Sequence, residues 1–319
     1  MVVVIAAYLQ DCEVRGMSPR SLPGYKSALK DFSGYLDSIK TDIMEVDKNV
    51  LKGYLEHSRR RGLSQRSIEL TFSVLSSYYE YLVYEGLVSS NPVPAIRKRY
   101  LRRYKDNGDP HERQLISVED SARMIKGEPD IRNKAILILL FKTGMRRNEL
   151  ITLDTSDVDL IENMIRLKPT GKRTNRTLFM DDEAAYILRR WLRVREGINK
   201  KKETALFISS WGNRISRNDV YQAVTNAAER VGLHDPESSR MEDHFSPHCC
   251  RHWFTTHLRR AGMRREFIQE LRGDARREAI DIYDHIDLKE LKEAFDLYNH
   301  IDLKELKEAY LACIPQLGI

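Results

Sequence analysis

Apolar residues in the first part of the chain recur every three or four positions, the spacing of one face of a helix. One such run follows the Ser18-Pro19 pair, and a second follows Ser64. Asp47 precedes a third. Serine and aspartate accept hydrogen bonds from the free amides at a helix start, so these residues mark helix N-termini. The pattern ends at the glycine and proline residues around 86–94. Residues 1–94 therefore predict a bundle of four or five short helices.

The pattern changes after residue 116. Ser117 begins a capping pattern, and residues 135–142 are apolar on every side, which predicts a buried helix. Three short alternating stretches then predict a small antiparallel sheet: Val158/Leu160, Ile165/Leu167 and Leu178/Met180. Helical spacing returns over 182–196, 216–231, 248–261 and 264–271. The predicted fold class is mainly α with a small antiparallel β-sheet.

A basic segment joins the two parts. Residues 95–105 contain six basic residues and no acid: Arg97, Lys98, Arg99, Arg102, Arg103 and Lys105. Such a segment suits a DNA backbone, because each neutralised phosphate releases counterions. A solvated charged linker is the alternative. The predicted organisation is a helical domain over 1–94, a linker over 95–115 and a second domain over 116–319.

Composition agrees with a nucleic-acid partner. The 319 residues carry a net charge of +6, and 41% of them are hydrophobic, which excludes a mainly disordered chain. The pI is near 9.0. The four cysteines show no metal-ligand spacing and favour a reduced, cytoplasmic location. The apolar start of the chain is too short for a signal peptide, and no stretch is long enough to span a membrane.

The candidate chemistry lies in three short stretches. Thr143–Leu150 contains Arg146, Ser246–His252 contains His248 and Arg251, and Tyr283 follows downstream. Guanidinium groups match phosphate oxygens two at a time, and His248 and Arg251 would share one face of a helix start. These residues predict a site that holds one phosphate and attacks it with a phenol.

These stretches resemble the tyrosine recombinase (phage integrase) family. The likeness covers the last two-thirds of the chain and adds the Gly171-Lys172 turn and the stretch from Leu271 to Tyr283. The first hundred residues look like the DNA-clamping domain of such enzymes. The resemblance implies an α+β catalytic domain of the DNA breaking-rejoining type. The part from 271 to 281 looks more like archaeal integrases than bacterial ones.

The resemblance also implies roles. Arg146 and Arg251 would hold the scissile phosphate, His248 would assist acid–base work, and Lys172 would protonate the leaving 5′-oxygen. Arg147 competes with Arg146 for its role, while Lys168 and Arg173 compete with Lys172. Glu149 would orient an arginine or histidine, and His252 would pack nearby. Double-stranded DNA is the expected partner, with four copies of the protein on two DNA sites.

Two features depart from the family pattern. Asp274 stands where the family usually carries histidine or tryptophan, and an ionised carboxylate there would repel a phosphate. The alternative is that Asp274 orients Arg276, Arg277 or His252. Residues 281–295 are repeated almost unchanged as 296–310, which gives a second candidate nucleophile, Tyr298. The spacing from Asp274 favours Tyr283, whereas Tyr298 keeps a tail of more usual length. The duplicated segment is amphipathic, and it could pack on its own domain or on a neighbouring copy.

The predicted protein is a metal- and ATP-independent recombinase that forms a 3′-phosphotyrosyl intermediate and needs no cofactor. A metal site at His244, His248 and His252 is disfavoured, because suitable carboxylate or thiolate partners are lacking. The alternatives are a DNA-binding protein of the same fold with impaired catalysis, and a type IB topoisomerase.

Overall fold

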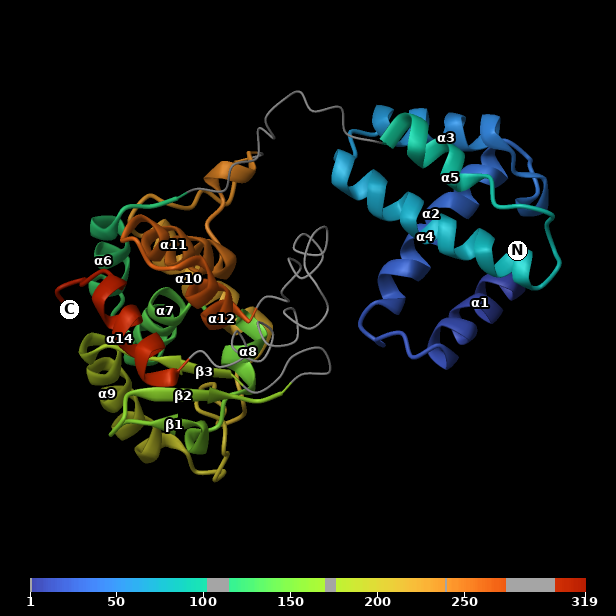
Figure 1. The fold of residues 1–319 in the computed structure, drawn as a ribbon. Coiled ribbons are helices and arrows are strands. Elements are labelled where there is room, and N and C mark those ends of the chain that lie inside the picture. The colour runs from blue at the N-terminus through green and yellow to red at the C-terminus, as the bar shows by residue number, and fades with distance from the viewer. Residues whose placement is uncertain (1, 102–114, 170–175, 239, 274–301) are drawn as a thin grey trace, which may run out of the picture. The chain divides into compact units, whose positions relative to one another are not determined.

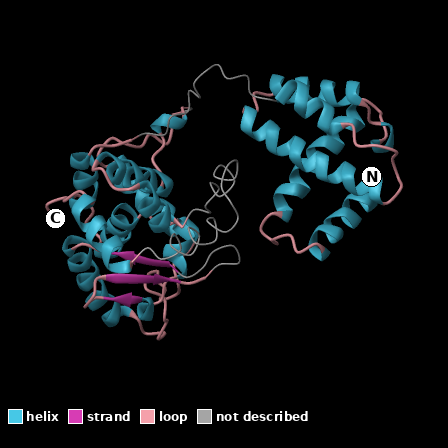
Figure 2. Cartoon of the chain, in the orientation of Figure 1, coloured by secondary structure: helices cyan, strands magenta, loops and turns pink. Residues whose placement is uncertain are grey.

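The computed structural model describes residues 2–101, 115–169, 176–238, 240–273 and 302–319. The chain divides into two compact units, Met1–Gly108 and Asp109–Ile319, each with its own hydrophobic core (Figure 1). Helices predominate, and one small sheet lies in the second unit (Figure 2). The predicted fold class is confirmed. Among the described helices, none has both the length and the apolar character that crossing a membrane requires.

The first unit is a helical bundle. Its elements are α1 (Val2–Val14), α2 (Leu22–Ser38), η1 (Ile43–Glu45), α3 (Lys48–Arg60), α4 (Gln65–Tyr84), α5 (Val93–Ile96) and η2 (Arg97–Leu101). The Asp47 side chain accepts hydrogen bonds from two amides at the start of α3, and Ser64 does so from one at the start of α4. The helix starts predicted at these two residues are therefore confirmed.

The bundle extends past residue 94. Pro92-Val93-Pro94 does not end it, because proline fits the first turn of a helix, where its missing N–H is not needed. The short helix α5 begins there, and η2 continues from it as a turn of π-helix. Val93, Ile96 and Leu101 are buried in the same core as α2 and α4. Residues up to Leu101 therefore pack with the bundle.

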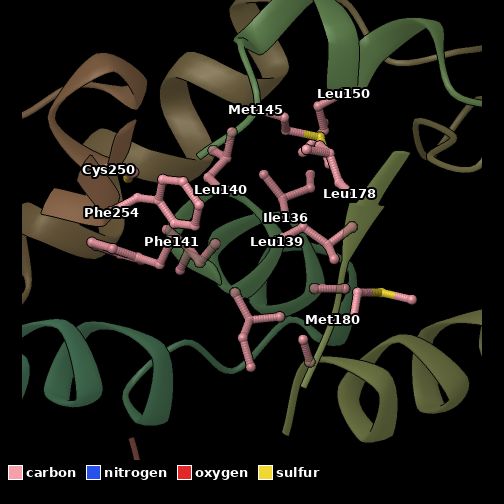
Figure 3. Packing of buried hydrophobic residues seen from close by; sticks show 14 of the residues in the cluster. Ile136, Leu139, Leu140, Phe141, Met145, Leu150, Leu178, Met180, Cys250 and Phe254 are labelled. Atoms are coloured by element: carbon pink, nitrogen blue, oxygen red, sulfur yellow. The ribbon is translucent and has the colours of Figure 1, made fainter. Parts of the chain in front are cut away.

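The second unit surrounds one buried helix. Its elements are α6 (Val118–Lys126), α7 (Ile131–Thr143), α8 (Arg147–Thr152), η3 (Thr155–Asp157), β1 (Val158–Asp159), β2 (Met164–Leu167), β3 (Arg176–Phe179), α9 (Asp182–Ile198), α10 (Arg217–Glu229), η4 (Met241–Asp243), α11 (Pro247–Arg260), α12 (Arg265–Arg272) and α14 (Leu303–Cys313). Every residue of α7 from Ala135 to Thr143 is buried, as its all-round apolar pattern predicts. Figure 3 shows α7 packed between β3 and α11.

The sheet is antiparallel in the order β1-β2-β3, with Ile165 opposite both Val158 and Leu178. This is the sheet that the alternating stretches predict. The last helix, α14, lies beside α7 and above β3 (Figure 1). The side chains of Leu306 and Tyr310 on α14 are buried in the core of the second unit.

Candidate functional site

One backbone oxygen brings together three arginine side chains. The carbonyl oxygen of Arg272, at the end of α12, accepts hydrogen bonds from Arg146 Nη1 at 2.9 Å and from Arg251 Nη2 at 2.8 Å. Arg176 Nη1 donates to the same oxygen at 2.7 Å. A carbonyl oxygen carries only a partial negative charge. Three cations around it therefore create a place where a full anion is favoured.

The turn after α7 positions two of these arginines. Gly144 adopts a left-handed conformation with φ of 59° and ends α7, and its carbonyl oxygen accepts a hydrogen bond from Arg251 Nη1 at 2.7 Å. A Cβ at this position would lie 2.3 Å from the ring of Phe254. Only glycine therefore allows Phe254 of α11 to pack against this turn. Arg146 is the N-cap residue directly before α8. The predicted Thr-Gly-x-Arg and His-x-x-Arg stretches thus meet at one turn.

Glu149 links two arginines in the same place. Its carboxylate accepts hydrogen bonds from the Arg146 backbone amide at 2.7 Å, from Arg146 Nη1 at 3.3 Å and from Arg176 Nη2 at 2.8 Å. The expectation that Glu149 lies close enough to orient an arginine agrees with this geometry. Both Glu149 and Arg176 are largely buried, so little water screens the pair.

Arg176 is the residue that sequence reasoning missed. It is the last residue of the run Lys168–Arg176, which matches the family's turn loosely. In that run the resemblance singles out Lys172 instead. The approach of α12 to β3 depends on Arg176. Gly273 follows Arg272 with φ of 57°, and a Cβ there would lie 1.7 Å from Arg176 Nη1. Arg176, the Arg272 carbonyl and Gly273 therefore form one tightly fitted contact between β3 and α12.

A cleft of about 360 Å³ opens beside the arginines. The described residues that line it include no acid, and they are Met145, Arg146, Arg147, Asn148, Arg217, Tyr221, Ser246, Pro247, His248 and Arg251. His248 is exposed in the first turn of α11, where Pro247 starts the helix and the helix dipole adds positive potential. The cleft suits an anionic ligand.

The other predicted histidine and the competing lysine lie elsewhere. His252 is exposed and does not line the cleft. The Lys168 ammonium contacts the Asp154 carboxylate directly and lies 3.5 Å from that of Asp157. The hydrogen bond from Lys168, together with those from Arg214 and Thr204, lowers the pKa of Asp154 to about 2 despite partial burial. Lys168 is therefore engaged in an ion pair at the end of β2.

Several predicted site residues lie outside the described residues. They are Lys172, its competitor Arg173, Asp274, Tyr283, Tyr298, Arg102, Arg103 and Lys105. Of the basic segment, Arg97, Lys98 and Arg99 are described, and all three are exposed on η2.

In the described part of the chain, no group of three or more His, Cys, Asp or Glu side chains is arranged so that it could hold a metal ion. His244, one of the three histidines weighed as ligands, has its Nε2 atom 2.7 Å from the carbonyl oxygen of Ser238. The four cysteines are free thiols.

Family models match both parts of the chain. The phage integrase family matches residues 113–290, and the phage integrase N-terminal SAM-like domain matches residues 5–86. The arginine cluster and the cleft both lie within the first of these matches.

Similar proteins cover most of the chain. A protein named tyrosine recombinase XerC from Thermodesulfovibrio yellowstonii is 30% identical over 287 residues, which is 87% of this chain and 89% of that protein. Another of the same name from Haemophilus ducreyi is 32% identical over 278 residues, 86% of each chain.

Solved structures share the fold. A lambda integrase dimer bound to a COC′ core site matches with a TM-score of 0.68, at 16% identity over 90% of this chain and 99% of that one. The Tn1549 transposon integrase in complex with transposon right end DNA matches with a TM-score of 0.67, at 18% identity over 93% and 99%. Together with the family matches, these similarities place the chain in the phage integrase family of tyrosine recombinases.

Proposed function

We propose that the protein cuts and rejoins double-stranded DNA at specific sites through a 3′-phosphotyrosyl intermediate. The observation that carries the proposal is the convergence of Arg146 and Arg251 on one oxygen, beside a cleft whose described lining residues include no acid. In the complex with DNA, an oxygen of the scissile phosphate would take hydrogen bonds from these guanidinium groups. Two such groups offset the negative charge on the non-bridging oxygens in the transition state without a metal ion.

The chemical step needs a nucleophile and an acid. The phenol oxygen of Tyr283, or of Tyr298, forms the new bond to phosphorus as the bond to the 5′-oxygen breaks. Lys172 supplies the proton that the 5′-oxygen takes up. His248 lines the cleft with Arg251 and assists the proton transfers, taking up the proton that the phenol releases as it attacks. The phosphotyrosyl ester conserves the energy of the broken bond, so the strand is rejoined without ATP.

The partner follows from the same chemistry. Two of the structures that share the fold are described as integrases on a core site and on transposon end DNA. By analogy, we propose that residues 1–94 clamp the duplex, that the basic segment follows its backbone and that residues 116–319 carry out catalysis. Four protomers on two DNA sites would complete the exchange. A cytoplasmic location is part of the same proposal.

The test is covalent trapping on a nicked suicide substrate. Tyr283→Phe and Tyr298→Phe are made separately and together, and the protein–DNA adduct is resolved on a denaturing gel. We expect the adduct to disappear in one single variant and in the double variant. An adduct that survives the double change would overturn the mechanism.

Two other outcomes identify the alternatives. Tight, salt-dependent binding without cleavage would indicate a DNA-binding protein with impaired catalysis, which the presence of Asp274 motivates. Relaxation of supercoiled DNA that has no target sequence would indicate a type IB topoisomerase.

A further inference from the structure

The last helix, α14, packs closely against the rest of the second unit. The Tyr310 ring is buried with its centroid 6.1 Å from that of Phe179, and its hydroxyl donates to the carbonyl oxygen of Lys142 at 3.0 Å. Leu306, one turn earlier on α14, is 1% exposed. We call the surface formed by Lys142, Glu162, Phe179, Glu183 and Arg264 the α14 seat.

Polar contacts fix the register of α14 in this seat. Near its start, Glu305 lies 3.4 Å from Arg264, and Lys307 lies 3.6 Å from Glu162. These contacts pair each charge with its opposite, so a shift of the helix by one residue would break both.

The tail beyond α14 is held as firmly. The Glu183 carboxylate accepts hydrogen bonds from the amides of Leu317 and Ile319, at 2.9 and 3.0 Å. Lys142 Nζ donates to the carbonyl oxygen of Pro315 at 2.6 Å. Ile314 and Leu317 are buried as well.

The seated residues belong to the second copy of the duplicated segment. The first copy carries the same Leu-Lys-Glu-Leu-Lys-Glu-Ala sequence over 288–294, followed by Phe295 in place of Tyr310. Leu291 corresponds to Leu306, Glu290 to Glu305 and Lys292 to Lys307, and Asp287 matches the capping Asp302. The first copy can therefore offer the seat the same leucine and the same two charges, and a phenyl ring in place of the phenol.

We propose that the α14 seat is a docking site for either copy, and that residues 288–295 of the same chain can replace α14 in it. The two occupants are not equal. The positions that correspond to Ile314 and Leu317 are Asn299 and Asp302, so the first copy lacks two buried apolar contacts. Because the first copy lacks these contacts, occupancy of the seat by α14 is favoured over occupancy by the first copy by about a hundredfold or more. This agrees with α14 being the occupant in the structure.

The chain is long enough for this exchange. The residues between Gly273 and Asp287 span up to roughly 45 Å when extended. A folded unit of this size is about 45 Å across. The first copy can therefore reach the seat without moving α12.

The exchange selects a tyrosine, a consequence that depends on the proposed function. Tyr283 precedes Leu288 by the same number of residues as Tyr298 precedes Leu303. Whichever copy occupies the seat thus presents its own tyrosine at the same distance along the chain. Occupation by α14 presents Tyr298, and occupation by the first copy presents Tyr283.

Crosslinking between cysteine pairs tests the docking without DNA. The parent carries Cys313→Ser, because Cys313 is the one cysteine among the four that is not buried. A crosslink between Glu162→Cys and Lys307→Cys shows that α14 occupies the seat. A crosslink between Glu162→Cys and Lys292→Cys shows that the first copy occupies it. A short bismaleimide is added, and the monomer with an internal crosslink is separated on a denaturing gel. In the parent, we expect efficient crosslinking at Lys307→Cys and little at Lys292→Cys.

Substitutions that make the two copies alike should shift the balance. Ile314→Asn with Leu317→Asp gives the second copy the residues of the first. We expect the Lys292→Cys crosslink to rise at least tenfold and the Lys307→Cys crosslink to fall. Adding Leu291→Ser should abolish the rise. Leu311→Ala, on the exposed face of α14, serves as the matched control and should leave both yields unchanged.

Two results would overturn the docking proposal. One is a Lys292→Cys yield that stays low while the Lys307→Cys yield falls. The other is a Lys292→Cys product that forms only between two chains. The adduct assay then tests the choice of tyrosine separately. Exchange of the two copies without any adduct would leave the docking proposal intact and reject the proposed function. An adduct that forms at the same tyrosine whichever copy occupies the seat would reject the link between the occupant and the choice of tyrosine.

Discussion

Arg146 and Arg251 donate hydrogen bonds to the same atom, the carbonyl oxygen of Arg272, at 2.9 and 2.8 Å. The first arginine directly precedes α8, the second lies within α11, and Arg272 ends α12, so three helices contribute to the contacts at this oxygen. The side chains are held in place before any ligand arrives. Preorganised donors of this kind stabilise a transition state without the cost of reorientation.

Removing either guanidinium should slow cleavage. We expect Arg146→Ala and Arg251→Ala each to lower the single-turnover cleavage rate by about 10²–10³-fold. Arg251→Lys should also be slow, because a lysine cannot donate to Gly144 and Arg272 with the fixed geometry of a guanidinium. Arg190→Ala, at an exposed position on α9, is the control. A wild-type rate in Arg146→Ala, with a slow Arg147→Ala, would transfer the role to Arg147.

A methyl group at Gly273 should disturb the contact with Arg176. Gly273→Ala meets two penalties: a left-handed backbone, which costs about 1–2 kcal/mol, and a Cβ placed against Arg176 Nη1. Gly232→Ala meets only the first, since nothing lies within 4 Å of its Cβ position and its φ is 76°. We expect Gly273→Ala to lower the free energy of unfolding by about 1–3 kcal/mol more than Gly232→Ala. Urea unfolding measures both, and equal losses would contradict the tight contact.

Acid should loosen the tail at Glu183. Burial raises the pKa of this carboxyl, but hydrogen bonds from Lys142 and from the Leu317 and Ile319 amides outweigh it, so the net pKa is lowered from 4.5. A carboxyl with a lowered pKa stabilises the folded state above its unfolded pKa, and this contribution is lost as the pH falls through the lowered value. We therefore expect hydrogen exchange of the Leu317 amide to accelerate as the pH falls below 4.5, after correction for intrinsic exchange. Glu183→Gln should lack this acceleration, and an identical profile would count against the assignment.

His248 should act in proton transfer. It is exposed in the cleft beside Arg251, where an imidazole can exchange protons with the reacting oxygens. We expect His248→Ala to lower the cleavage rate by about 10²–10⁴-fold and to flatten one limb of its pH dependence. His252→Ala, outside the cleft, should keep the shape of the profile. If the two variants behaved alike, His248 would have no special role.

The basic residues of η2 should contribute to the salt dependence of DNA binding. Arg97, Lys98 and Arg99 are exposed together, and each phosphate neutralised adds about 0.9 to the slope of log K against log salt. The triple alanine variant should therefore reduce the magnitude of the slope by up to roughly 2.7. Titrations at several salt concentrations measure it. An unchanged slope would mean that these residues do not contact the DNA backbone.

Much of the fold could be predicted because local chemistry dictates it. The amide-capping roles of Asp47, Ser64 and Ser117 follow from side chains that accept hydrogen bonds at helix starts. The buried helix α7 follows from a run of residues that has no polar face. Prolines near residue 92 were ambiguous, since the same residue both stops one helix and starts the next.

The site was only partly predictable. Arg146, His248 and Arg251 stand in recognisable motifs, and the structure brings all three to one cleft. The acceptor that Arg146 and Arg251 share with Arg176 could not be found, because a backbone oxygen leaves no mark in the sequence. Arg176 itself is one of many arginines in a basic run, and only the pairing of β3 with β2 directs it toward Glu149.

Two residues at the C-terminal end of α7, separated by Thr143, hold different parts of the second unit. Lys142 holds the C-terminal tail through Pro315, and Gly144 holds Arg251 through its carbonyl oxygen. A single turn of backbone therefore carries both the anchor of the chain's end and the acceptor that positions Arg251 beside the cleft. Lys142 also pairs with the carboxylates of Asp181 and Glu183, so the tail shares its anchor with the core of the second unit. The end of the chain is thus tied to a point only two residues from the contact that holds Arg251.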